Sequence, residues 1–159
     1  MFSILAEAVD GARVLDLYAG SGSMGIEALS RGAESAVFVD NSDEAAEALK
    51  TNLAHTKLTD KSRVIRENVV TFLSREAASQ AVYDLIFLDP PFRIDMIDLE
   101  AVFEVLGDGN LAGKDGLVVL RLYSRIEPPD WPGFSETKNR AYGDSRLLFY
   151  RPKEKDLVT

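Results

Sequence analysis

The 159-residue sequence contains no cysteine and a single histidine, His55. The lack of cysteine excludes disulfides and thiolate metal sites, and one histidine excludes a multi-histidine centre, so we expect no metal. No apolar run approaches the roughly 20 residues of a membrane span, and the start, MFSILAEAVD, is too acidic for a signal peptide. We therefore expect a cytoplasmic, monomeric protein that does not associate with a membrane.

Negative charge exceeds positive charge in this sequence, and the formal net charge is −8. This balance argues against indiscriminate binding of nucleic acid through the fold, since phosphate contacts require Lys and Arg. It leaves room for a local basic strip, for which Lys138, Arg140 and Arg146 are the candidates.

Short apolar segments alternate with helix-like segments along the chain. The strands are expected at residues 13–19, 34–40, 62–67, 83–89 and 116–123, and the helices at 23–31, 42–56, 69–77 and 97–109, the last ending on Gly107 or Gly109. This alternation predicts an α/β fold of the Rossmann-like type, with a mostly parallel sheet and helices on both faces. Residues 134–152 alternate around Gly143-Asp144, which predicts a C-terminal antiparallel hairpin and seven strands in all. We expect one domain over residues 1–152 and a solvated tail over 153–159.

A glycine-rich segment follows the first predicted strand. Gly20, Gly22 and Gly25 form a G-x-G-x-x-G pattern, and Asp40 closes the second strand, where an acid can bind ribose hydroxyls. The pattern fits both a dinucleotide and S-adenosylmethionine. Asp16, at the end of the first strand, favours the second ligand, because a carboxylate attracts an ammonium or sulfonium group and repels a pyrophosphate. A tight turn with an incidental acid is the structural alternative.

The segment DLIFLDPPF (84–92) ends a strand on an acid, two prolines and an aromatic ring. Pro90 and Pro91 lack the N–H groups that a helix capped by Asp89 would need, so capping is a poor explanation. Two acceptors, the Asp89 carboxylate and the Pro90 carbonyl, beside the ring of Phe92 suit an exocyclic amino group on a planar base. Such acceptors favour the charge that develops on nitrogen during alkylation, and the base must leave its stack to reach them.

These motifs together resemble those of the RsmD-type methyltransferases. The resemblance lies in YAGSGSMGIEALSRG (18–32), VFVDNS (37–42), ENVVTFL (67–73) and DLIFLDPPF (84–92), and covers about residues 2–150. It implies transfer of a methyl group from S-adenosylmethionine to N2 of a guanine in small-subunit (16S) ribosomal RNA. It also implies that the partner is ribosomal RNA or the small ribosomal subunit, and that the chain is truncated, because family members begin with a further basic segment.

The resemblance assigns a role to each matched position. Asp89, Pro90, Pro91 and Phe92 would form the target-base site. The cofactor-binding residues would be Asp16, Tyr18, Ala19, Gly20, Ser21, Gly22, Asp40, Asn41, Asn68 and Val69. Val69 departs from the Asp or Ala that many relatives have there, and the resemblance assigns it an adenine contact through its backbone.

Three other functions are also compatible with the sequence. An adenine-N6 methyltransferase acting on DNA or RNA shares the D/N-P-P-F/Y/W motif. An NAD-dependent dehydrogenase shares the glycine pattern but leaves Asp89 unexplained, and an RNA-assembly factor would retain only the fold.

Three single residues are lesser candidates. We interpret His55 as a surface residue. Trp131 has a packing role over the hairpin or contacts RNA, and Arg93 pairs with a phosphate of the flipped nucleotide or faces solvent.

Overall fold

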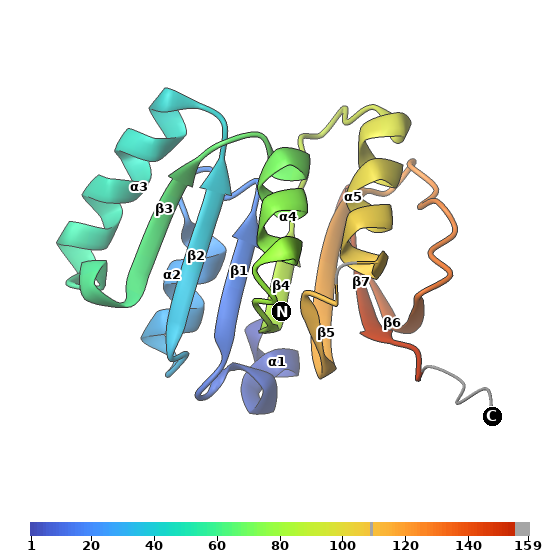
Figure 1. Ribbon diagram of the computed structural model, residues 1–159, viewed down its shortest axis with the longest axis horizontal. Helices are drawn as coiled ribbons and strands as arrows, with labels where there is room; N and C mark the ends of the chain where they lie inside the picture. The colour runs from blue at the N-terminus through green and yellow to red at the C-terminus, as the bar shows by residue number, and fades with distance from the viewer. Residues whose placement is uncertain (109, 155–159) are drawn as a thin grey trace.

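A seven-stranded sheet in the order β3-β2-β1-β4-β5-β7-β6 organises the chain (Figure 1). The computed structural model describes residues 1–108 and 110–154. Strands β1 to β5 are parallel, and β7 pairs antiparallel with both β5 and β6. The fold class predicted from the sequence is confirmed, including the terminal hairpin at the sheet edge.

The elements follow the predicted order. The strands are β1 Arg13–Leu17, β2 Ser35–Asp40, β3 Ser62–Arg66, β4 Tyr83–Leu88, β5 Ala112–Tyr123, β6 Phe134–Tyr142 and β7 Ser145–Pro152. The helices are α1 Phe2–Val9, α2 Ser23–Ser30, α3 Asp43–Thr56, α4 Val69–Ala78 and α5 Met96–Asp108, with a 3₁₀ helix at Thr59–Lys61. Gly109 and most of the predicted tail, 155–159, lie outside the described residues.

Two apolar layers cover the sheet. The first joins one face of the strands to α4 and α5, which stand in front of the sheet in Figure 1. The second joins the opposite face to α1, α2 and α3. Because the parallel strands are buried on both faces, they read as continuous apolar runs, and this made them recognisable in the sequence.

One strand begins earlier than predicted. β5 starts at Ala112 instead of residue 116, because its pairing with β4 continues through an irregular stretch in which Tyr83 faces Ala112 and Leu85 faces Leu117. This stretch contains Gly113, and it ends at Gly116, where the predicted strand began. Glycine inside a strand often marks such a bulge.

The loop between β5 and β6 contributes to the core. Trp131 stacks on Phe103 of α5, with ring centroids 4.1 Å apart and planes 9° apart, and its Nε1 donates to the Phe103 carbonyl. Its ring also meets Phe134 and Tyr150 of the hairpin. The packing role expected for Trp131 is confirmed, while His55 is exposed.

Gly25 brings α2 close to the sheet, and replacing it by alanine should destabilise the protein. An added Cβ would lie 2.8 Å from Phe38 Cζ and 3.1 Å from Asp16 Oδ2, and overpacking of this kind costs about 1–3 kcal/mol. Urea unfolding of Gly25→Ala measures this loss. Gly107→Ala is the control, because its nearest neighbour is 3.6 Å away; an equal loss in both variants would contradict the packing argument.

Candidate active site

The loop after β1 turns sharply through left-handed backbone. Tyr18 has φ 58°, Gly20 has φ 56° and Gly22 has φ 84°. A bulky residue such as Tyr18 in this region costs about 1–3 kcal/mol, and such strain gathers at functional sites. An added Cβ at Gly20 would meet nothing within 4 Å. The space beyond the loop at Gly20 is therefore open.

Side chains from neighbouring elements hold this loop in place. One oxygen of Asp40 accepts from the Gly20 N–H at 2.9 Å, and the other accepts from the Ser42 N–H at 3.0 Å. Asn52 of α3 donates to the Ser21 carbonyl at 2.9 Å. Each Asp40 oxygen retains a second lone pair, so the carboxylate can fix the loop and still accept from a ribose hydroxyl.

Asp16 is the one polar or charged residue of the described chain that is buried with the core. Its Oδ2 accepts from the Gly25 N–H at 3.0 Å. Burial raises the pKa of Asp16 to about 8; the Gly25 hydrogen bond opposes this shift, and the nearby charges of Asp89 and Asp40 add to it. The charges of Asp40, at the end of β2, and Asp89, after β4, therefore act on Asp16 in β1.

Asp89 follows β4 directly beside the glycine loop. Its N–H points to the Leu17 carbonyl at 3.4 Å, which extends the pairing of β4 with β1. Its Oδ1 lies 3.4 Å from Arg121 Nε on the other neighbouring strand, β5. Burial raises the pKa of Asp89, and Arg121 lowers it. The net direction is upward because the effect of burial is larger than that of Arg121, whose side chain is 52% exposed and screened by water.

Phe92 rests against a second residue of β5. Its ring centroid lies 4.2 Å from that of Tyr123, with 42° between the planes, and its side chain is 59% exposed. Pro90 is buried and Pro91 is exposed. The motif therefore presents one accessible ring next to the Asp89 carboxylate.

A hollow of about 550 Å³ opens at the carboxyl ends of the strands, within the usual size of small-molecule sites. Seven predicted site residues line it: Tyr18, Asp40, Asn41, Asn68, Val69, Asp89 and Pro91. Four carboxylates line it, from Asp40, Asp89, Asp95 and Asp98, against the single cation of Arg93. The site thus suits a positively charged ligand.

The remaining predicted residues lie outside this lining. Ala19, Gly20, Ser21 and Gly22 form the loop described above, while Asp16 lies buried at the end of β1. Phe92 packs on Tyr123. Asn68 has a structural task as well, because its Oδ1 caps α4 by accepting from the Thr71 N–H at 3.1 Å.

A second hollow of about 710 Å³ lies between α4 and α5 and contains none of the predicted site residues. Among residues 1–108 and 110–154, no group of three or more His, Asp or Glu is placed to hold a metal ion. Within the same residues, every helix is too short or too polar to cross a membrane.

Comparison with known proteins gives the family. Residues 1–151 match the family described as conserved hypothetical protein 95. The chain belongs to that family. It is 33% identical over 154 residues to YlbH of Bacillus subtilis, provisionally named an rRNA methyltransferase, covering 96% of this chain and 83% of the relative. It is also 33% identical to ribosomal RNA small subunit methyltransferase D of Escherichia coli, covering 82% of this chain and 65% of that protein. The resemblance inferred from the motifs is confirmed.

Solved structures support this membership of the family. The structure of HI0767 from Haemophilus influenzae, provisionally described as a methylase, aligns with a TM-score of 0.82 at 28% identity and covers 96% of this chain and 94% of that one. A Thermus thermophilus protein, TTHA0928, aligns with a TM-score of 0.76 at 32% identity, over 93% of this chain and 79% of that one.

Sequence reasoning missed two residues of β5 at this site, Arg121 and Tyr123. A signal for Arg121 exists, because it is the single charge inside the apolar run LVVLRLY (117–123). The register pairs Leu88 with Leu120, so the next position on each strand brings Asp89 and Arg121 together. This step requires the strand order, which the sequence does not state.

The free energy of unfolding should fall as pH rises across the range set by Asp16. Its pKa rises from 3.8 to about 8 on folding, so between these values the folded chain holds a proton that the unfolded chain has lost. Asp16→Asn cannot ionise and should therefore gain stability relative to the unsubstituted protein as pH increases from about 4 to about 8. Urea unfolding across this range is the measurement; parallel pH curves for the two proteins would contradict the assignment.

Proposed function

We propose that this chain methylates the exocyclic N2 of a guanine in small-subunit (16S) ribosomal RNA, with S-adenosylmethionine as the methyl donor. The observation that carries the proposal is the position of Asp89. It ends a strand that pairs with β1, and it lines the same hollow as Tyr18 and Asp40, which flank the glycine loop and contact it. The amine site and the cofactor site are therefore contiguous. The relatives named for small-subunit rRNA methylation support the substrate.

The residues present fit S-adenosylmethionine better than a dinucleotide. The carboxylates of Asp40, Asp89, Asp95 and Asp98 line one hollow, and such a cluster repels a pyrophosphate and attracts a sulfonium or an ammonium. Asp40 would accept from the ribose hydroxyls, the loop from Asp16 to Gly22 would hold the amino-acid part, and Asn68 and Val69 would flank the adenine. When bound, the group supplies an electrophilic methyl.

The chain's own residues prepare the nucleophile. The Asp89 carboxylate accepts a hydrogen bond from the target NH₂ and favours the positive charge that grows on its nitrogen. Phe92, 59% exposed, offers its face to the flipped base, a stacking contact worth roughly 1–3 kcal/mol. No general base is required before alkylation, because the proton leaves the nitrogen afterwards. The product of the cofactor is S-adenosylhomocysteine.

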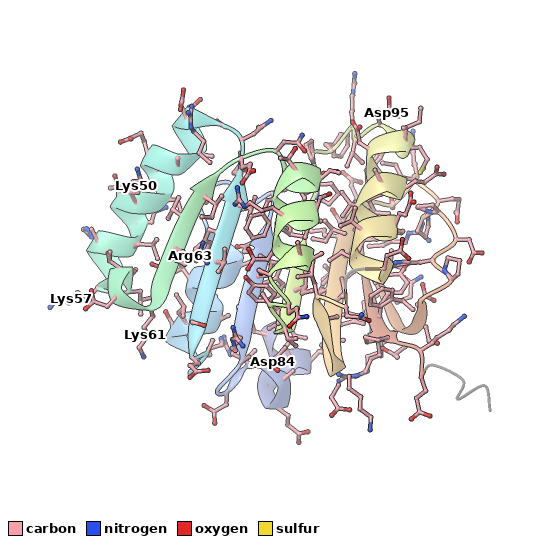
Figure 2. All side chains as sticks on the ribbon, in the orientation of Figure 1. Lys50, Lys57, Lys61, Arg63, Asp84 and Asp95 are labelled. Carbon is pink, nitrogen blue, oxygen red and sulfur yellow. The ribbon has the colours of Figure 1, made fainter. Side chains whose placement is uncertain are left out.

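Asp89→Asn should reduce the turnover number by roughly 100- to 1,000-fold, the effect of removing one preorganised polar group from a reacting centre. The measurement is methyl transfer to unmodified 16S ribosomal RNA, with mass spectrometry of the nucleosides to identify the base. Asp84→Asn is the matched control, because Asp84 lies near the opposite end of β4 (Figure 2). Appearance of N6-methyladenine in place of N2-methylguanine would reject the assigned target.

Arg121→Gln should shift the acid limb of the pH–rate profile to higher pH. The guanidinium lowers the pKa of Asp89, so its removal raises that pKa, and the ionised acceptor is lost at a higher pH. Arg121→Lys keeps a charge and should restore part of the shift. If the maximal rate changes but the pH midpoint of the acid limb does not, Arg121 acts only on structure.

A further inference from the structure

A row of paired residues leads from Asp89 across the sheet to its edge. Arg121 lies 3.4 Å from Asp89, Arg121 is opposite Leu147 on β7, and Leu147 is opposite Arg140 on β6. Directly opposed residues point to the same face of a sheet. At about 4.8 Å per strand, this row extends roughly 15 Å from the acid.

An aromatic row runs beside the first one. Phe92 packs on Tyr123 at 4.2 Å, Tyr123 is opposite Ser145, and Ser145 is opposite Tyr142. Tyr142 is 47% exposed. Aromatic surfaces therefore lie at both ends of this row, at the amine site and at the sheet edge.

The two faces of the hairpin carry charges of opposite sign on β6. Lys138 is opposite Phe149 and Arg140 is opposite Leu147, and both of these β7 residues belong to the apolar layer that contains α1, α2 and α3. Glu136, in contrast, is opposite Tyr150, which packs with α5. On the first face, β6, β7 and residues 117–123 of β5 present no acid.

This face of the hairpin is also accessible. Every residue of β6 from Ser135 to Tyr142 is exposed. The face is directed away from α4 and α5, which stand in front of the sheet in Figure 1. The other predicted cation, Arg146, is not part of it, because it points to the opposite face, is opposite Ala141, and donates to the Ile126 carbonyl. The prediction of a basic strip formed by Lys138, Arg140 and Arg146 is therefore wrong for Arg146.

We propose that this surface, which consists of Arg121, Tyr123, Lys138, Arg140 and Tyr142 and is called the hairpin face here, holds the single-stranded RNA that flanks the target nucleotide. The inference rests on the proposed function. Cations spaced along an exposed face bind phosphates, and interleaved aromatic rings stack bases, which is how single strands are held. The row begins at Asp89, so RNA on the hairpin face would enter the amine site directly.

The first test is the salt dependence of binding. Lys138→Gln/Arg140→Gln should lower the slope of log K against log salt for unmodified 16S ribosomal RNA by about 1.4, at about 0.7 per lost phosphate contact. The matched control is Lys50→Gln/Lys61→Gln, on α3 and the 3₁₀ helix beside the opposite sheet edge (Figure 2). The control should retain the original slope, and both double variants should bind S-adenosylhomocysteine unchanged by calorimetry.

The second test concerns stacking. Tyr142→Ala should weaken RNA binding by about 5- to 150-fold, the equivalent of one stacked base, whereas Tyr142→Phe keeps the ring and should bind like the unsubstituted protein.

The outcomes separate the two proposals. If the protein methylates RNA but the salt slope falls equally in both double variants, or in neither, the proposed RNA-binding role of the hairpin face is wrong and the proposed function stands. A chain that binds neither S-adenosylhomocysteine nor RNA overturns the proposed function and the hairpin face with it.

Discussion

The structure depends on the parallel register that places acids at the ends of three adjacent strands. β1 pairs with β2 on one side and with β4 on the other, so Asp16, Asp40 and Asp89 cannot move apart without breaking the sheet. Burial raises the pKa of Asp16, and the neighbouring charges of Asp89 and Asp40 add to this rise, so ionisation of Asp16 opposes folding. A cationic ligand would relieve that repulsion. The stability of the apolar sheet thus maintains an unfavourable arrangement of charge, which favours the ligand that neutralises it.

The glycine loop between β1 and α2 is held firmly beside these acids. Asp40 holds it through Gly20, and Asn52 holds it through the Ser21 carbonyl. These contacts stabilise the left-handed backbone, which the chain would not adopt alone. Because contacts within the chain hold the loop, little ordering entropy has to be lost on binding.

Much of the fold and of this site could be predicted from the sequence, for reasons that particular residues make clear. Gly20 and Gly22 lie in the loop after β1 and Asp89 follows β4, and the carboxyl ends of parallel strands meet at one edge. Arg121 and Tyr123 were missed because their role depends on which strand is the neighbour of β4. Local patterns carry no such information.

The same limit explains the misplaced cation of the hairpin. Arg140 and Arg146 are six residues apart, an even spacing that would place both on one face of an uninterrupted strand. A turn intervenes, so only the register shows that they point to opposite faces. The sign of the net charge, −8, is therefore a poor guide to what the surface can bind. Acids are concentrated around the hollow, whereas one face of the hairpin carries Lys138 and Arg140 and no acid from β6 or β7. A molecule that is acidic overall can therefore attract a polyanion locally.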